Sequence, residues 1–409
     1  LCTVLGALRS GVVPVLLNAT LLPAERQLLV DDARPRITVT QRQELDELVQ
    51  GRPRPLAPHP LSRPMHYTSG TTGQPKGVWA GLWDEATAAT AFADEADLWS
   101  FGPDDVHLVC SPMYHSVSIR FAAGTLLSGG TCVVLTRFDP IVARRALEGT
   151  AGTVPTTTFM APAALNRLLE TAGGDMSDVL ANLRLLVHAG SPAPASLKHA
   201  ALAAVRPGAL WEFYGSTEGQ FTVCSPDEWR ARPGTVGRAR PGRTLAVDPD
   251  GTIWCRPPGF ASFRYWGDDE KTEEAWREGF FTVGDLGSLD GDGYLFIDGR
   301  RDDLIISGGV NVYPAEVEAV LSEAAEVADV GVFGMPDDRW GERVCAALVP
   351  RGRQIAPGLA DAVAAFADTR LAPYKRPKQY IVVEDLPRTA TGKLQRHRLR
   401  ALLAAEATG

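Results

Sequence analysis

A loop rich in glycine and threonine, with one lysine near its end, has the residue types that bind polyphosphate. Residues 67–78 read Tyr-Thr-Ser-Gly-Thr-Thr-Gly-Gln-Pro-Lys-Gly-Val. Glycines lack a Cβ, so the backbone N–H groups around them can turn toward an anion. Hydroxyl groups and a lysine ammonium add donors and positive charge. The loop is not a Walker A motif, because Lys76 follows Pro75 and precedes Gly77. The predicted phosphate-binding residues are Thr68, Ser69, Gly70, Thr71, Thr72, Gly73 and Lys76.

A second segment carries groups suited to the rest of a nucleotide. Residues 211–219 read Trp-Glu-Phe-Tyr-Gly-Ser-Thr-Glu-Gly. Tyr214 offers a flat face for adenine, and Thr217 offers a hydroxyl for the α-phosphate. Glu218 offers a hard oxygen ligand for Mg²⁺. Taken alone, the segment is explained about equally well by a buried tyrosine and a solvated glutamate.

In this order the two segments resemble the adenylate-forming enzymes, a family of acyl- and aryl-CoA ligases, stand-alone adenylation domains and firefly luciferase. That family opens its phosphate loop with Tyr/Thr-Ser-Gly-Thr-Thr-Gly-x-Pro-Lys-Gly-Val and carries Tyr-Gly-Ser/Thr-Thr-Glu downstream. The matching motifs run from residue 67 to residue 394 and the family-like pattern covers nearly all of the chain. The other matches are Pro-Met-Tyr-His at 112–115, Ala-Gly-Ser-Pro at 189–192, Val-Gly-Asp at 283–285, Gly-Arg at 299–300, Gly-Gly at 308–309 and Thr-Gly-Lys-Leu at 391–394.

The resemblance implies a role for each matching residue. It places Lys393 in the active site during adenylation, together with Thr217 and Glu218, and makes Asp302 the hinge of a mobile domain. One departure is Val283, where the family usually has Thr or Ser, but Asp285 stays in register. The implied nucleotide-binding residues, besides the phosphate loop, are Gly190, Ser191, Tyr214, Gly215, Asp285 and Arg300, and the implied acyl-pocket residues are His115, Gly190 and Gly219. Gly308 and Gly309 flank a tunnel for coenzyme A in this interpretation, or form a plain turn in the alternative.

Composition and charge exclude several classes of protein. The chain has 409 residues, 45% hydrophobic and 22% charged, which is typical of globular proteins with two or more domains. A net charge of −8 argues against nucleic acid as a main partner. No apolar run reaches the ~18 residues of a membrane span. The six cysteines show no Cys-x-x-Cys spacing, which favours reduced cytoplasmic thiols over disulfides or a zinc site.

Hydrophobic patterns predict an α/β fold with a large N-terminal domain and a small α+β C-terminal domain, and the resemblance implies that the C-terminal domain is mobile. A helix around Leu5 and Leu8 followed by a strand over 12–16 begins the chain, and the resemblance places this unit well inside the family's N-terminal domain, so we expect a further portion upstream. We expect an AMP-binding domain over 1–299, with a β-rich subdomain at 230–298 and the mobile domain at 300–409. A proline-rich connector spans 49–64. The expected strands are 106–110, 131–135, 183–188 and 381–383, and the expected helices are 160–172 and 194–206.

The resemblance implies an ATP-dependent carboxylic acid–CoA ligase, using ATP, Mg²⁺ and coenzyme A, with fatty acid metabolism as its setting. An acyl-AMP ligase that loads a carrier protein is the nearest alternative, and a catalytically silent nucleotide-binding homologue is another. A homodimer is compatible with the sequence. The acid is left open between fatty, aromatic and polycyclic, because the candidate pocket residues are small or polar. Arg120 either pairs with a second carboxylate or faces solvent. The basic runs at 373–378 and 395–398 are expected to be solvated, with the first also a candidate for CoA phosphates.

Overall fold

The structure is a computed structural model that describes residues 1–51, 55–68, 76–149, 152–171, 176–307, 310–337, 340–352, 358–388 and 394–406. The chain divides into two compact units. The first contains Leu1–Leu245 and Trp254–Val283, and the second contains Ala246–Ile253 and Gly284–Gly409. The expected domain boundary near residue 300 stays a prediction. In the described ranges no helix is long and apolar enough to cross a membrane.

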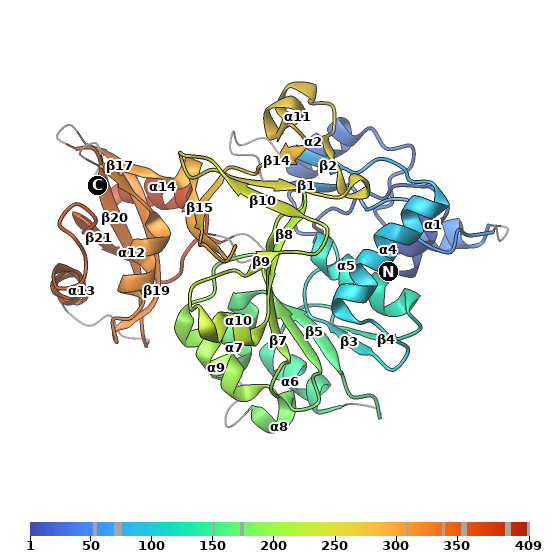
Figure 1. Ribbon diagram of the computed structural model, residues 1–409, viewed down its shortest axis with the longest axis horizontal. Helices are drawn as coiled ribbons and strands as arrows, with labels where there is room; N and C mark the ends of the chain where they lie inside the picture. Colours follow the sequence, from blue (N-terminus) through green and yellow to red (C-terminus); the bar gives the residue numbers. More distant parts are fainter. Residues whose placement is uncertain are drawn as a thin grey trace. The chain divides into compact units, whose positions relative to one another are not determined.

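A seven-stranded sheet organises the first unit (Figure 1). Its central strands are parallel, while the last two are antiparallel to their neighbours. Parallel neighbours need crossover connections, and helices supply them here. In spatial order the strands are β4 (Thr131–Val134), β3 (Val106–Val109), β5 (Thr157–Met160), β6 (Leu185–His188), β7 (Leu210–Gly215), β8 (Gln220–Cys224) and β9 (Arg238–Ala239).

Helices cover both faces of this sheet, because side chains alternate along each strand. On one face, Leu186 packs with α6 (Pro140–Glu148), α7 (Pro162–Thr171) and α9 (Ala195–Ala204). On the other face, Val187 and Phe213 pack with Trp99 of α4 (Glu85–Trp99) and Phe121 of α5 (Ser116–Leu127). This second face carries the cavity described below. The short α8 (Ser177–Leu180) and α10 (Pro226–Ala231) lie in connections of the same sheet.

Smaller elements complete the first unit. The strand β2 (Lys76–Trp79) pairs on one side with β1 (His66–Thr68) and on the other with β12 (Arg264–Tyr265), all antiparallel. Short strands follow the large sheet, and the predicted subdomain bounds of 230–298 stay a prediction. The elements after the large sheet are β10 (Thr244–Val247), β11 (Ile253–Arg256), η1 (Gly259–Ala261), α11 (Asp269–Ala275), β13 (Trp276–Arg277) and β14 (Phe280–Phe281), and the N-terminal helices are α1 (Cys2–Arg9), α2 (Pro23–Ala33) and α3 (Arg42–Val49).

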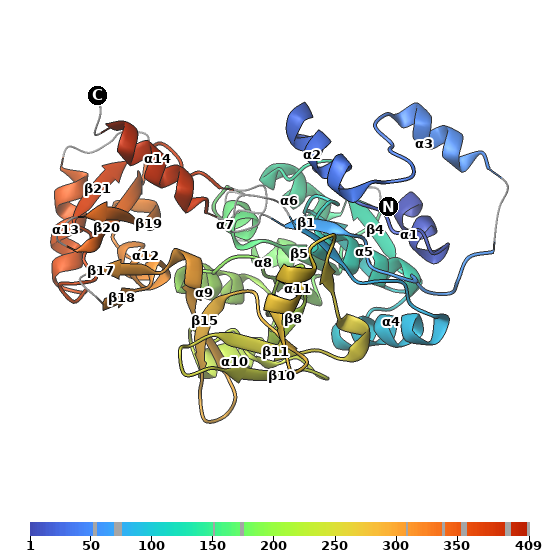
Figure 2. The same ribbon diagram turned by 90° about the horizontal axis from the view of Figure 1, so that it is seen from above.

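The second unit has a sheet with helices on both sides (Figure 2). Leu321 of α12 (Pro314–Leu321) and Val363 of α13 (Leu359–Asp368) pack on one face, while Leu399 and Leu403 of α14 (Arg396–Glu406) pack on the other. The strands are β17 (Ile305–Ser307), β18 (Val310–Val312), β19 (Val327–Asp337), β20 (Gly341–Pro350) and β21 (Gln379–Val382), preceded by the hairpin β15 (Asp285–Leu289) and β16 (Leu295–Arg300) and by η2 (Arg301–Asp303).

Two sequence expectations are corrected here. The strand expected over 12–16 is wrong, because the segment forms only the single bridge Val15–Met65 and no continuous ladder. The expectation of solvated side chains at 395–398 is wrong for Arg396. Its guanidinium donates to Asp303 at 2.9 Å, to Glu318 at 2.7 Å and to the carbonyl of Val332 at 2.8 Å. These partners come from other elements, which the local sequence does not reveal.

Candidate active site

The described ends of the phosphate loop lie on paired strands. Thr68 of β1 and Lys76 of β2 are cross-strand partners, and residues 69–75 between them lie outside the described residues. The predicted roles of Ser69, Gly70, Thr71, Thr72 and Gly73 therefore stay predictions. The ammonium of Lys76 lies 4.9 Å from the centre of the Tyr265 ring, an attraction between a cation and a π-face.

Tyr265 links the phosphate-loop lysine to the predicted metal ligand. Its hydroxyl donates to Oε1 of Glu218 at 3.0 Å, and Glu218 is only 6% exposed. The strand β12 holds the ring there by pairing Tyr265 with Val78 of β2. Sequence reasoning missed Tyr265, because its aromatic neighbours make it look like an ordinary core residue. Lys76 and Glu218 therefore contact the same tyrosine, one at its ring and the other at its hydroxyl.

The turn between β7 and β8 presents Thr217 and Glu218 and requires glycines on both sides. A Cβ at Gly215 would lie 2.8 Å from the carbonyl oxygen of Gly219. A Cβ at Gly219 would lie 2.6 Å from the Phe281 ring. Within the turn, Ser216 donates its N–H to the carbonyl of Gly219 at 2.8 Å. The tight turn therefore fixes where the hydroxyl and the carboxylate emerge from the sheet.

A cavity of about 170 Å³ opens beside this turn. Thr217 and Gly219 are in its wall, and Gln220 and Arg120 line it as well. The lining surface is mostly apolar and comes from α4, α5 and the segment around residue 260. The structure thus brings Gly219, one of the three predicted acyl-pocket residues, to the cavity. His115 and Gly190 are not in its wall, and their roles stay predictions.

The histidines near the cavity are neutral at ordinary pH. Burial lowers the pKa of His66, which lines the cavity, to about 4. Burial also lowers the pKa of His115 to about 4. His66 places Nδ1 3.0 Å from the carbonyl oxygen of Tyr114, which immediately precedes His115. This contact ties β1 to the segment before α5.

The predicted adenine side lies at the ends of β6 and β7. Tyr214 places its ring 4.8 Å from the ring of Phe221, measured between centroids. Gly190 follows β6 with φ +96, a conformation that glycine adopts without strain, and exposed Gly190 leads into partly buried Ser191. Neighbouring parallel strands present their C-terminal ends at the same sheet edge, where α/β proteins commonly bind ligands.

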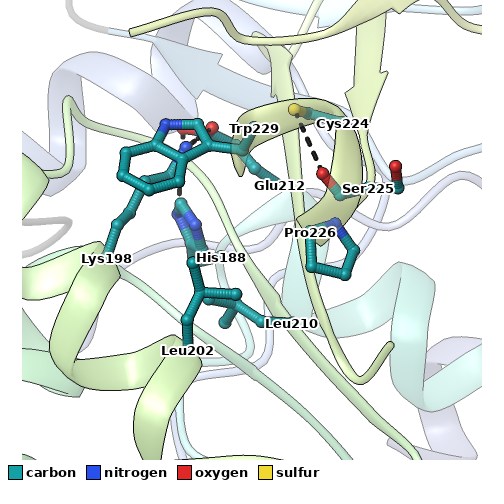
Figure 3. Close-up of a pocket in the computed structure, with 9 residues that line it drawn as sticks. All are labelled: His188, Lys198, Leu202, Leu210, Glu212, Cys224, Ser225, Pro226 and Trp229. Carbon is teal, nitrogen blue, oxygen red and sulfur yellow. Dashed lines mark hydrogen bonds and ion pairs between the residues drawn. The ribbon is translucent and has the colours of Figure 1, made fainter. Parts of the chain in front are cut away.

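A buried polar cluster lies beneath these two strand ends (Figure 3). The ammonium of Lys198 in α9 forms a short ion pair with Oε2 of Glu212 in β7. It also lies 4.8 Å from the centre of the Trp229 ring. His188, the last residue of β6, has Nδ1 3.9 Å from Oε1 of Glu212, and burial lowers its pKa to about 4. The cluster ties β6, β7 and α9 together two residues before Gly190 and Tyr214.

The second unit holds the predicted ribose residues next to each other. Asp285 and Arg300 are partners across β15 and β16, and Nε of Arg300 lies 3.1 Å from Oδ1 of Asp285. Asp302 belongs to η2, but its side chain lies outside the description. Gly308, Gly309 and Lys393 also lie outside the described residues. The chain on either side of residues 389–393 is held by the bridge between Arg388 and Leu394.

The basic run at 373–378 is tied to its own unit. Lys375 pairs with Glu316, and Lys378 donates to the carbonyl oxygen of Pro373 at 2.7 Å. Arg376 donates to the carbonyl oxygen of Leu371 at 2.8 Å. These contacts fix the three cations in place, and a role toward CoA phosphates stays a prediction.

Glu218 fits a magnesium ion that arrives with a nucleotide. The described residues contain no group of three or more His, Cys, Asp or Glu side chains that could hold a metal by themselves. Mg²⁺ commonly uses one or two carboxylates and completes its shell with substrate phosphates and water. Tyr265 contacts one oxygen of Glu218, and the carboxylate has a second oxygen to offer.

The paired ends of the predicted phosphate loop, the buried Glu218 carboxylate and the adjacent apolar cavity fit the site expected of an enzyme that activates an acid with a nucleotide. The chain matches the family model described as AMP-binding enzyme over residues 52–262 and the AMP-binding enzyme C-terminal domain over residues 316–393. The chain belongs to the family of AMP-binding, adenylate-forming enzymes, with a large mixed α/β N-terminal domain and the family's C-terminal domain.

Several relatives are acid–CoA ligases. The chain is 34% identical to an indoleacetate–CoA ligase of Aromatoleum aromaticum over 83% of its length, and spans 66% of that relative, just under two thirds. It is 32% identical to a 2-succinylbenzoate–CoA ligase of Bacillus cereus over 96% of its length, with 84% of that relative covered.

Solved structures show the same fold. ATP-bound MatB from Rhodopseudomonas palustris superimposes with a TM-score of 0.83 at 30% identity, covering 97% of this chain and 84% of that one. The o-succinylbenzoate CoA synthetase from Bacillus subtilis with its acyl-adenylate intermediate has a TM-score of 0.79 at 28% identity, covering 96% and 84%. These two relatives were therefore seen with ATP and with an acyl-adenylate bound.

Proposed function

We propose that this protein is an ATP-dependent carboxylic acid–CoA ligase. The observation that carries the proposal is the β7–β8 turn. Glu218 accepts a hydrogen bond from Tyr265, whose ring also contacts Lys76, while Thr217 and Gly219 line the cavity. One turn thus serves a nucleotide on one side and an organic acid on the other. The family membership and the names of the CoA ligase relatives support the same function.

The first step joins the acid to the nucleotide. A carboxylate oxygen of the acid attacks the α-phosphorus of ATP, and pyrophosphate leaves with the electron pair of the broken P–O bond. Two anions must approach each other, so positive charge and donors near the α-phosphate lower the barrier. Lys76, the Thr217 hydroxyl and Lys393 supply these groups. Magnesium on Glu218, when bound, neutralises further phosphate charge.

The second step transfers the acyl group to coenzyme A. The thiol sulfur attacks the acyl carbon of the adenylate, AMP leaves, and the thiol proton passes to solvent. In this proposal Asp302 is the hinge about which the C-terminal domain moves between the steps, and Gly308 and Gly309 border the thiol path. Asp285 with Arg300 would hold the ribose, since a carboxylate accepts two vicinal hydroxyl donors.

The test is to incubate the purified protein with ATP, Mg²⁺, CoA and a panel of acids, including indoleacetate and 2-succinylbenzoate. Release of pyrophosphate and formation of a CoA thioester support the ligase. Acyl-AMP without thioester indicates loading of another acceptor, such as a carrier protein. No pyrophosphate with any acid contradicts both enzymatic functions and favours the silent homologue. None of the relatives described above is named for a fatty acid, so fatty acids enter the panel as one class among several.

A further inference from the structure

The cavity beside Thr217 has a concentration of arginines that its own carboxylates do not balance. Helices α4 and α5 both contribute to its wall, each with residues at helical spacing. Ala88, Ala91, Phe92 and Glu95 come from α4, and Ser116, Ile119, Arg120, Ala123 and Leu127 come from α5. Arg63 and Arg243 line the same cavity. Three guanidinium groups in a mostly apolar wall are costly to keep without anionic partners.

The two carboxylates in the cavity wall, those of Asp94 and Glu95, already accept hydrogen bonds from residues other than Arg120. The carboxylate of Asp94 accepts two hydrogen bonds from Arg243, at 2.6 and 2.9 Å, and one from Arg240. Glu95 accepts from Arg240 at 2.8 Å and from Gln220 at 2.6 Å. Burial by itself would raise the pKa of Glu95, but Arg120 and Arg240 outweigh it and lower this pKa to about 2, so Glu95 is ionised.

Arg120 lies close to Glu95, but the described residues do not supply all of its hydrogen bonds. Its Nε lies 3.5 Å from Oε2 of Glu95, within ion-pair range but without a hydrogen bond. Nε and Nη2 are both buried and have no hydrogen-bond partner among the described residues. The guanidinium also lies 5.0 Å from the centre of the Phe213 ring, which restrains its position. The buried hydroxyl of Ser216, also in the cavity wall, has no partner in the described part of the chain either.

Arg63 adds a second incompletely paired cation. Its one hydrogen bond within the described ranges goes to the carbonyl oxygen of Ser262 at 3.3 Å. Burial and the neighbouring Arg120 lower the pKa of Arg63 to about 10, so it is still charged at neutral pH. The four guanidiniums of Arg63, Arg120, Arg240 and Arg243 face the two carboxylates of Asp94 and Glu95, which leaves two positive charges. Even when Glu218, which also attracts Arg63, is counted, one positive charge is left over.

We infer that the acid taken by this cavity carries a second carboxylate, which binds Arg120 with Arg63 nearby. This inference rests on the proposed function, since the reacting carboxylate is the one placed at Thr217. The distal carboxylate does not react; it accepts the unused N–H groups of Arg120 and neutralises the excess charge. A cavity of about 150 Å³ accommodates benzene, so about 170 Å³ suits a linker the size of one ring or a short chain. The substrate class is a compact dicarboxylic acid.

The test compares acids that differ only in the distal charge. Isophthalate and its monomethyl ester form one pair, and adipate and its monomethyl ester form another. ATP–pyrophosphate exchange gives kcat/KM for each acid. A charge-assisted hydrogen bond corresponds to a preference of roughly 10- to 100-fold, so the diacid of at least one pair is expected to exceed its ester by that factor. In Arg120→Met the ratio should fall close to one, and in Arg120→Lys part of it should return.

Controls separate this inference from folding and from the proposed function. Arg206→Met removes an exposed arginine outside the cavity and should leave the ratio unchanged. Turnover of the esters by Arg120→Met shows that this variant is folded. If the wild type has the same kcat/KM for an ester as for its diacid, the inference is overturned but the ligase function stands. The same holds if Arg120→Met lowers kcat/KM equally for a diacid and its ester. If no acid supports exchange, the proposed function fails. Calorimetry in the presence of AMP then still tests the inference, which requires isophthalate to bind more tightly than its monomethyl ester.

Discussion

Replacing Lys198 with methionine isolates the buried ion pair beneath the sheet edge. Lys198 and Glu212 are 5% and 8% exposed, and each is the other's main charged partner. Methionine preserves the length of the side chain but leaves a carboxylate buried without its cation. Breaking a buried pair in this way costs about 3–5 kcal/mol of the free energy of unfolding. The melting temperature of the first unit should fall by on the order of 10 °C.

The size of this loss should depend on pH because of His188. Burial holds its folded-state pKa at about 4, against an ordinary value of 6.5. The wild type therefore loses stability as pH falls from 6.5 toward 4, because the unfolded state takes up a proton that the folded state does not. Lys198 contributes to lowering this pKa, and Glu212 opposes it. Removing Lys198 raises the pKa of His188, so the variant loses less stability than the wild type as pH falls. The difference in free energy of unfolding between wild type and variant should therefore be smaller at pH 5 than at pH 8.

Urea unfolding at pH 8 and pH 5, followed by tryptophan fluorescence, measures both effects, since Trp229 packs on Lys198. The double variant Lys198→Met, Glu212→Leu removes both charges and should recover most of the stability, as replacement of whole buried pairs often does. Lys271→Met, which breaks a partly exposed pair with Asp268, is the control and should cost at most about 1 kcal/mol. A double variant as unstable as the single one would refute the charge argument and point to packing alone.

Three further outcomes are expected. Tyr265→Phe keeps the ring near Lys76 but removes the hydrogen bond to Glu218, and should lower kcat/KM for pyrophosphate release by roughly 10-fold or more; an unchanged rate would show that Glu218 needs no positioning. Lys393→Ala should slow adenylation by ~10²–10³ and leave CoA transfer from supplied acyl-adenylate far less affected, which rapid-quench measurement of each half-reaction can check. Thiol labelling at pH 8 should modify exposed Cys2 first, because Cys110, Cys224 and Cys255 are buried and burial raises their pKa values to about 12; fast labelling of these three would contradict the buried arrangement.

Much of the fold was predictable where the pattern is local. The strands at 106–109, 131–134 and 185–188 and the helices at 162–171 and 195–204 appear within a few residues of their expected positions. Their apolar runs and turn residues carry the information themselves. The segment 12–16 shows the limit, because β-branched residues form a strand only when a partner lies alongside. For α14 the charged start concealed a helix whose Leu399 and Leu403 are buried.

Some features of the candidate site could likewise be predicted from local sequence, and others could not. The sequence by itself determined the family and predicted the phosphate loop and the Thr217–Glu218 turn, because these depend on residue types at fixed short spacings. Only the tertiary structure decided that Tyr265, about 190 residues from Lys76 in sequence, contacts both Lys76 and Glu218. It also decided that Arg120 lines a cavity together with Arg63, whereas the sequence left open whether Arg120 faces solvent. Such contacts depend on how strands and helices distant in the chain pack together, and no local pattern records that packing.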